Sequence, residues 1–312
     1  MSYDVLYCHG TIAAFDLGDI VRLITFWTGG TTRLGVIDDS SSGGGGVIDL
    51  NSANPAVPAD LQQALAAGID VLAAARAALG SSAVRLPLAD VRPAPVVPRP
   101  GKIICLGLNY YDHAKEGGRD KPTYPWFFLR CATSLMADGE PGVRPRVSDK
   151  FDYEAELALV IGKRARHVKR ADALDFVFGY TCFNDMSVRD YQKKTPQWTI
   201  GKNFDATGGF GPHLVTADEL PRGGEGLKIE LRLNGDVLQS ANTSDMIFGV
   251  AETIELLTEC MTLEPGDVIV MGTPAGVGFA RTPQVWMKDG DVVEVAIERI
   301  GKLVNPIRDE PV

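Results

Sequence analysis

Residues 152–161 constrain the fold more than any other segment, because they predict a β-strand that carries two acidic side chains. The second half of this segment is apolar, contains branched residues and lacks Gly and Pro. Residues two apart on a strand point to the same face, so Glu154 and Glu156 lie side by side while Ala155 and Leu157 face the other way. Neighbouring carboxylates in an apolar strand are costly to bury unless a positive charge lies between them. The pattern predicts either a solvated strand face or a site for a hard divalent cation.

Strands dominate the sequence after about residue 100. Apolar runs predict strands at residues 102–108, 126–129, 153–161, 178–183, 227–233, 268–271 and 292–297. The pattern predicts helices at residues 109–116, 171–176, 186–192 and 248–260. Many strands, few long helices and no regular alternation of the two argue against a Rossmann fold or a TIM barrel. We therefore predict a mainly β fold with α/β elements, arranged as an antiparallel or mixed β-roll.

The sequence divides into a small and a large part. Its 312 residues can form one large domain or a main domain with a smaller one. Residues 1–85 predict a small N-terminal α+β domain. Residues 86–100 contain five prolines, which predict a stiff, extended linker. Residues 101–312 then form the main domain.

Two elements are predicted within the small N-terminal domain. Alternating residues at 20–37 indicate an antiparallel hairpin, with Gly29 and Gly30 at its turn. Apolar residues at helical spacing predict one helix over residues 59–79, a segment rich in Ala, Leu and Gln.

Composition narrows the partners and the compartment. The formal net charge of −9 argues against nucleic acid or an anionic membrane as the main partner. We find no apolar run of the length that a transmembrane helix needs, and no signal-peptide pattern at the start of the chain. The five cysteines are scattered and form no Cys-x-x-Cys pair. This usage favours reduced thiols over a disulfide framework or a zinc site, so we expect a cytoplasmic protein.

A third acid can complete the opening pair. Asp185 stands where the strand predicted at 178–183 gives way to the helix predicted at 186–192. One interpretation is a helix N-cap, a position that favours Asp. The other is a third metal ligand beside Glu154 and Glu156. Three carboxylates would leave positions for water and substrate, which suits an open catalytic Mg²⁺ or Mn²⁺ site.

A second constellation is His113-x-x-Glu116. On a helix this spacing places the imidazole and the carboxylate within reach of each other. A carboxylate beside an imidazole fixes its tautomer and raises its basicity, as in a general base that activates water. The alternative is a surface helix with ordinary charged residues.

A glycine-rich loop follows the apolar strand predicted at 268–271. Its residues, 272–278, include Gly272 and Thr273, and such a loop can bring backbone N–H groups close to an anion such as a substrate carboxylate. The loop lacks the Lys and Ser/Thr of a nucleotide-binding P-loop. Lys202 is a candidate for a cation in the same pocket.

In combination, these motifs resemble the fumarylacetoacetate hydrolase superfamily, in the form of a bacterial-type member with an N-terminal extension. The resemblance covers about residues 85–310. The matching motifs are Gly107-Leu108-Asn109-Tyr110 leading to His113 and Glu116, Asp152-Tyr153-Glu154-Ala155-Glu156-Leu157, Asn184-Asp185-Met186-Ser187-Val188-Arg189-Asp190, Gly201-Lys202-Asn203-Phe204-Asp205, Asn242-Thr243-Ser244-Asp245-Met246-Ile247-Phe248, and Leu263-Glu264-Pro265-Gly266-Asp267-Val268-Ile269 with the loop 272–278.

The resemblance implies a mixed β-sandwich roll, a homodimer and one divalent cation per subunit. The cation would be Mg²⁺ or Mn²⁺, with Ca²⁺ able to take its place in crystals. Glu154, Glu156 and Asp185 match the metal ligands. His113 and Glu116 match a water-activating dyad on a lid that orders over bound substrate, with Lys202 as a further catalytic residue.

The resemblance also implies a set of substrate-binding residues. They are Tyr110, Arg130, Arg189, Gln192, Lys202, Gly272 and Thr273. One position departs from the pattern, because many bacterial members have Phe-Leu-Lys-Pro where this chain has Phe128-Leu129-Arg130-Cys131. A guanidinium binds carboxylates through a bidentate fork, so Arg130 changes the geometry of that contact.

These features predict a metal-dependent hydrolase that cleaves a C–C bond in an acylpyruvate or another 2,4-dioxo acid, in the breakdown of an aromatic compound. The substrate would be a small anionic 2-oxo acid, bound through the metal. Decarboxylation, enol–keto isomerisation, hydration and lyase reactions of 2-oxo acids remain alternatives, because they begin with the same metal-bound enolate. A catalytically silent binding protein with the same fold is a further alternative.

Overall fold

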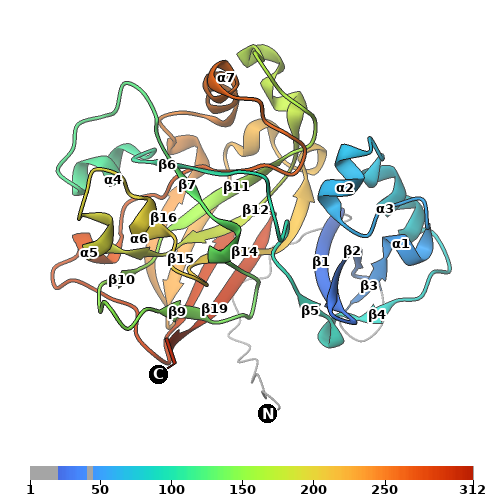
Figure 1. The fold of residues 1–312 in the computed structure, drawn as a ribbon, viewed down its shortest axis with the longest axis horizontal. Coiled ribbons are helices and arrows are strands. Elements are labelled where there is room, and N and C mark those ends of the chain that lie inside the picture. Colours follow the sequence, from blue (N-terminus) through green and yellow to red (C-terminus); the bar gives the residue numbers. More distant parts are fainter. Residues whose placement is uncertain (1–19, 41–44, 312) are drawn as a thin grey trace.

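The computed structural model describes residues 20–40 and 45–311 (Figure 1). The first 19 residues of the predicted N-terminal domain lie outside this part. Two β-sheets form most of the structure, and a cluster of helices from the N-terminal segment packs at one side. In the described part, no helix has the length and hydrophobicity needed to cross a bilayer.

The larger sheet has 12 strands. Ten of them follow the order β4-β3-β2-β1-β14-β12-β11-β17-β6-β7, while β5 pairs with β1 and β8 pairs with β14. Its strands are β1 (Arg22–Thr28), β2 (Thr31–Asp38), β3 (Gly46–Asp49), β4 (Leu86–Pro87), β5 (Arg92–Pro93), β6 (Ile103–Gly107), β7 (Trp126–Arg130), β8 (Leu135–Met136), β11 (Ala155–Ile161), β12 (Val177–Asp185), β14 (Gly208–Thr216) and β17 (Val268–Val270). Most neighbours are antiparallel, but β17 and β6 run parallel, so the sheet is mixed.

A second sheet packs against the first. Its order is β16-β15-β18-β19-β9, and a separate two-stranded sheet joins β10 to β13. These strands are β9 (Gly142–Arg144), β10 (Phe151–Asp152), β13 (Ser187–Val188), β15 (Lys228–Leu233), β16 (Asp236–Asn242), β18 (Val292–Ile297) and β19 (Gly301–Asp309). The mainly β fold predicted from the sequence, a mixed β-sandwich roll, is confirmed.

Helices are short and lie outside the sheets. The α-helices are α1 (Leu50–Ala53), α2 (Leu61–Ala66), α3 (Val71–Leu79), α4 (Tyr111–Glu116), α5 (Arg189–Gln192), α6 (Thr199–Lys202) and α7 (Val250–Cys260). The 3₁₀ turns are η1 (Leu88–Asp90), η2 (Ala132–Ser134), η3 (Arg170–Phe176), η4 (Ala217–Glu219), η5 (Arg222–Gly224), η6 (Thr243–Asp245) and η7 (Gly278–Ala280).

Strand β11 is buried on both faces, and its alternation follows the sequence prediction. Leu157 and Leu159 pack into the core between the two sheets, whereas Ala158 and Val160 pack into a second core under the N-terminal helices. Residues at even positions therefore share one face of β11, and Glu156 belongs to that face.

The N-terminal segment joins the large sheet. The predicted hairpin is confirmed: β1 and β2 pair across Gly29 and Gly30, both at positive φ. Strand β1 also pairs with β14, and the proline-rich segment contributes β4 and β5 as short edge strands. One continuous sheet thus contains strands from both predicted domains and from the segment between them. The division into domains at residues 85 and 100 stays a prediction.

Two helix predictions are wrong. The single helix predicted at 59–79 is two helices, because Gly68 takes a φ of +71° and Asp70 starts α3 by accepting a hydrogen bond from the N–H of Ala73. The helix predicted at 186–192 begins only at Arg189, because Ser187 and Val188 pair with β10 as a strand.

Because His213 on β14 is buried, we expect the free energy of unfolding to fall in acid. Burial, reinforced by the charge of Arg22, lowers its pKa from 6.5 to about 3, and its Nε2–H donates to the Ile300 carbonyl at 2.6 Å. Between these two pKa values the unfolded chain binds a proton that the folded chain does not. Stability from His213 is therefore complete above pH 6.5 and is lost as the pH falls towards 3, by at most about 1.4 kcal/mol per pH unit.

Urea unfolding of wild type and His213→Gln at pH 7 and pH 5 checks this expectation. The variant should show a flatter loss of unfolding free energy, and His167→Gln, at an exposed position, should match wild type. Asp138 contributes the opposite slope, since burial raises its pKa to about 6. The comparison is therefore between variant and wild type, and parallel curves for the two would contradict the role of His213.

Candidate metal centre and active-site pocket

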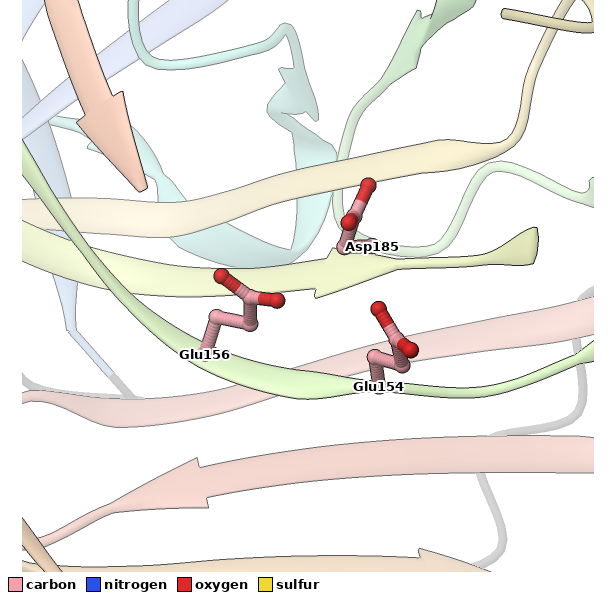
Figure 2. A group of neighbouring side chains, drawn as sticks. All are labelled: Glu154, Glu156 and Asp185. Carbon is pink, nitrogen blue, oxygen red and sulfur yellow. The ribbon is translucent and has the colours of Figure 1, made fainter. Parts of the chain in front are cut away.

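Three buried carboxylates meet at the end of the large sheet. Glu154 immediately precedes β11, Glu156 lies within it, and Asp185 ends the neighbouring strand β12. Each offers a carboxylate oxygen, and these oxygens lie within 4.8 Å of one another. Figure 2 shows the two glutamates close together on one segment of the chain, beside the end of the strand that carries Asp185. The N–H of Asp185 donates to the Glu154 carbonyl at 2.9 Å, so the sheet ladder itself holds the group together. Asp185 is a strand residue here and caps no helix.

Three cations surround this acidic group. Lys202 Nζ, at the end of α6, lies 2.5 Å from Glu154 Oε2 and 2.6 Å from Asp185 Oδ2. Arg189 Nη2, on α5, lies 2.7 Å from the other oxygen of Glu154. Arg130 Nη1, at the end of β7, lies 2.5 Å from Asp185. Two of the three acids thus have cationic partners.

Glu156 has a different environment. In the described part of the chain no Lys, Arg or His nitrogen lies within 4 Å of its carboxylate, and its hydrogen bond comes from the N–H of Gly272 at 2.6 Å. Burial raises the pKa of Glu156 well above its usual range, and the charges of Asp185 and Glu154 raise it further. Burial would also raise the pKa of Glu154, but Arg189 and Lys202 outweigh it and lower that pKa.

The donor set fits a divalent cation. All three groups supply oxygen ligands, which Mg²⁺ and Mn²⁺ prefer. Glu156 has no neighbouring cation to balance its charge, and a metal ion bound by the triad would supply one. Glu154, Glu156 and Asp185 would hold the ion, as the resemblance implies.

His113 and Glu116 form the expected pair on α4. His113 Nδ1 lies 2.7 Å from Glu116 Oε1, and the His113 side chain is 9% exposed. Because a carboxylate only accepts, Nδ1 carries the hydrogen and Nε2 is left as the basic nitrogen. The second oxygen of Glu116 accepts the N–H of Gly276 at 2.9 Å, which fixes the carboxylate from its other side.

The glycine-rich loop uses its N–H groups on the protein's own carboxylates. Gly272, Gly276 and Gly278 donate to Glu156, Glu116 and Asp152 respectively. A Cβ on Gly276, whose φ is +106°, would lie 2.2 Å from the Leu238 carbonyl oxygen, so this position needs glycine. The sequence favoured a substrate anion as the partner of this loop. In the structure, the loop instead connects the acidic group to the His113–Glu116 pair.

A cavity of about 580 Å³ opens over these groups. The cavity is lined by His113 and by two of the three acids, Glu154 and Glu156. Four other predicted site residues also line it: Arg189, Gln192, Lys202 and Thr273. Thr273 Oγ1 accepts a hydrogen bond from buried Gln239 at 2.9 Å, which leaves the hydroxyl hydrogen of Thr273 to donate into the cavity.

Three of the residues predicted to bind substrate do not line this cavity, namely Tyr110, Arg130 and Gly272. The Arg130 side chain is fully buried and bonds to Asp185, Thr207 and Ser134. A Cβ on Gly208 would lie 2.9 Å from the Arg130 guanidinium, so glycine at that position makes room for it. The structure thus places Arg130 behind a candidate metal ligand.

Two functional residues were not singled out from the sequence. Buried Asp152 accepts hydrogen bonds from Arg189 Nε at 2.8 Å and from the N–H groups of Gly278 and Phe279, so it positions Arg189 beside Glu154. Its signal was present, since it lies two residues before Glu154. Gln239 on β16 holds Thr273, and nothing in its local sequence marks it.

Comparison with protein families gives one match. The family described as "Fumarylacetoacetate (FAA) hydrolase C-terminal" matches residues 102–308. Among curated proteins, the mitochondrial oxaloacetate tautomerase Fahd2a of Rattus norvegicus is 40% identical over 265 residues, covering 85% of this chain and 84% of that protein. The Homo sapiens oxaloacetate tautomerase FAHD2A is 41% identical over 266 residues, with the same coverage.

Solved structures share the fold. A fumarylacetoacetate hydrolase from Exiguobacterium antarcticum superposes with a TM-score of 0.78 at 33% identity, covering 93% of this chain and all of that one. A maleylpyruvate hydrolase from Sphingobium has a TM-score of 0.75 at 32% identity, with the same coverage. A 5-carboxymethyl-2-hydroxymuconate delta-isomerase from Mycobacterium smegmatis has a TM-score of 0.72 at 29% identity, with the same coverage again.

Proposed function

This chain belongs to the fumarylacetoacetate hydrolase family, and on that premise we propose that it is a divalent-metal-dependent tautomerase of 2-oxo acids of the oxaloacetate type. The reaction interconverts keto and enol forms by moving one proton between the enol oxygen and the neighbouring carbon, so that an O–H bond breaks as a C–H bond forms, or the reverse. The observation that carries the proposal is that one cavity is lined by a buried imidazole, His113, and by carboxylates of the acidic triad.

His113 would take and return the proton. Its Nδ1–H is held by Glu116, so Nε2 is the nitrogen that accepts a proton. Protonation of Nε2 makes an imidazolium, which the Glu116 carboxylate stabilises. Because the same nitrogen can return the proton, tautomerisation needs no water and no second base.

The triad and its cations would bind the acid end of the substrate. A bound divalent cation supplies Lewis-acid polarisation of a carbonyl. Lys202 and Arg189 line the cavity and place positive charge where an enolate oxygen develops, and the Thr273 hydroxyl adds a donor. Asp152 and Gln239 keep Arg189 and Thr273 oriented.

The charge balance of the buried group favours an anionic substrate. Its four carboxylates, those of Asp152 and the triad, exceed its three cations, those of Arg130, Arg189 and Lys202, by one. A divalent cation would reverse the sign of this excess. The loaded site would then attract a carboxylate, whereas the bare group offers no net positive charge, whether or not Glu156 holds a proton.

Sequence identity to curated relatives supports tautomerisation over the hydrolysis predicted from the sequence. Two relatives named oxaloacetate tautomerase are 40% and 41% identical over 85% of this chain. Hydrolysis of an acylpyruvate is the second candidate. His113 would then take a proton from water, and the likeness to a maleylpyruvate hydrolase supports this reaction.

Product analysis separates the two candidates. Purified protein with Mg²⁺ is given freshly dissolved enol oxaloacetate and, separately, an acylpyruvate. We expect faster loss of the enol ultraviolet absorbance without release of pyruvate or CO₂, and no faster cleavage of the acylpyruvate. Cleavage of the acylpyruvate without an effect on the enol would replace tautomerase by hydrolase. Release of CO₂ from oxaloacetate would indicate a decarboxylase.

Four further expectations stay predictions that rest on the resemblance and on composition. They are Mg²⁺ or Mn²⁺ as the metal, a homodimer, a cytoplasmic location and a place in the breakdown of aromatic compounds.

A further inference from the structure

We propose that three cations at the mouth of the cavity, Arg119, Lys193 and Lys194, hold the second carboxylate of a dicarboxylic 2-oxo acid. We call these residues the mouth cations. The inference rests on the proposed function and deepens it, because it assigns residues that select a dicarboxylate over a monocarboxylate. All three residues line the cavity that is also lined by His113, Glu154 and Glu156, and all three are exposed.

The mouth cations follow the two helices that carry His113 and Arg189. Arg119 follows α4, and its N–H bonds back to the Ala114 carbonyl at 2.9 Å. Lys193 follows α5, and its N–H bonds to the Arg189 carbonyl at 3.1 Å. Each helix thus places one buried group, His113 or Arg189, in the interior and a cation at the entrance.

The mouth cations differ from the deeper cations of the cavity in their ion pairs. Within residues 20–40 and 45–311, none of the three forms an ion pair with a carboxylate, whereas Arg189 and Lys202 deeper in the cavity are both paired. This differs from the chain as a whole, where acidic residues exceed basic ones. Positive charge gathered without a partner at one entrance favours an anionic group there.

Aromatic rings hold the mouth cations in place. The Arg119 guanidinium lies 5.2 Å from the centre of the Trp126 ring. The Lys193 ammonium lies 4.5 Å from the centre of the Phe279 ring. Trp126 and Phe279 also line the cavity, so these contacts keep two of the charges at its edge.

The depth of the cavity separates the two ends of the ligand. A 2-oxo acid group bound at the buried triad and Lys202 directs the rest of the molecule toward the exposed entrance. Part of the cavity wall is apolar and aromatic, with Trp126 stacked on Trp198 at 5.5 Å and Phe128 beside them. This wall suits a carbon skeleton, and the charge beyond it suits a terminal carboxylate.

The test compares oxaloacetate, a dicarboxylate, with phenylpyruvate, a monocarboxylic 2-oxo acid that also tautomerises. Lys193→Gln/Lys194→Gln should lower the ratio of kcat/KM for oxaloacetate to kcat/KM for phenylpyruvate about tenfold, mainly through KM for oxaloacetate. Arg119→Gln should lower it in the same direction. Lys163→Gln, at an exposed lysine that forms no ion pair with the described residues, should match wild type.

Added salt gives a second readout. Because exposed charges are screened, raising ionic strength should reduce the preference of wild type for oxaloacetate more than that of the double variant, which keeps only Arg119 of the mouth cations. An unchanged ratio in the double variant would overturn the proposal. An equal loss with both substrates would also overturn it, since that pattern indicates a merely structural role.

Calorimetric binding keeps this inference distinct from the proposed function. If wild type tautomerises neither compound, the proposed function is wrong, and affinity decides the role of the mouth cations. Tighter binding of oxaloacetate than of phenylpyruvate in the presence of Mg²⁺, lost in the double variant, would support the proposal. Equal affinities in wild type would overturn it.

Discussion

His113→Ala is expected to lower kcat for tautomerisation by about 10²- to 10⁴-fold, the range for loss of a general base, while divalent-cation binding persists. The imidazole is the group in the cavity whose basic nitrogen is freed by a carboxylate partner, so no neighbour replaces it. Glu154, Glu156 and Asp185 keep the hydrogen bonds and ion pairs described above, none of which includes His113. Rates from enol absorbance and Mn²⁺ affinity from calorimetry measure the two effects separately.

Two further variants define the role of the His113–Glu116 pair. Glu116→Gln removes the charge that stabilises the imidazolium but keeps a hydrogen-bonding group beside Nδ1, so kcat should fall less than in His113→Ala. His167→Ala, at an exposed histidine, should leave kcat unchanged. Wild-type turnover in His113→Ala would remove His113 from the mechanism, and loss of Mn²⁺ binding in that variant would show that it supports the metal site instead.

Glu156→Gln is expected to weaken Mn²⁺ binding by at least about 100-fold and to abolish metal-dependent turnover. Glu156 is the informative ligand to change, because its partner is the N–H of Gly272, which a Gln oxygen can still accept. Asp185 is less suitable, since its loss would leave buried Arg130 without the carboxylate that it pairs with. Calorimetric titration with Mn²⁺ measures the loss.

The stability of the Glu156→Gln variant controls for misfolding. In the metal-free protein, burial and the neighbouring acids raise the pKa of Glu156, so this carboxyl contributes stability at low pH and loses it as the pH rises. A neutral amide should therefore leave the metal-free protein at least as stable as wild type at pH 7. Glu264→Gln, at a surface ion pair, should leave Mn²⁺ binding unchanged. Wild-type Mn²⁺ affinity in Glu156→Gln would exclude Glu156 as a ligand.

The meeting of the acids was predictable because it depends on local geometry. A spacing of two on a strand puts Glu154 and Glu156 on one face, and Asp185 ends the adjacent strand. The His113–Glu116 contact likewise depends on one turn of helix. Such short-range rules need no knowledge of the tertiary structure.

Partners distant in sequence could not be predicted in the same way. Arg130 was expected to contact substrate, but the fold brings the end of β7 to Asp185 and Thr207, far away in the sequence, and Arg130 bonds to both. The N–H groups of the glycine-rich loop were assigned to a substrate anion, and the structure directs them to carboxylates more than a hundred residues away, such as Glu156. The mouth cations come together only because α4 and α5 lie at the same cavity.

The sequence prediction also missed strands β14, β16 and β19, and for β14 the residues show why. Strand β14 contains Gly208, Gly209, Gly211 and Pro212, residues that normally interrupt strands. In this protein, glycine at 208 and 209 leaves space for Arg130 and Asn305, so close packing explains these residues better than a turn does.

The most direct test of the account follows the loss of enol oxaloacetate with Mn²⁺-loaded protein, with the same protein after chelation, and with the chelated protein resupplied with Mn²⁺. We predict acceleration by the loaded protein, its loss on chelation and its return with Mn²⁺, with no recovery in Glu156→Gln or His113→Ala. Acceleration that survives chelation, or that persists in both variants, would contradict a reaction that depends on the acidic triad and His113.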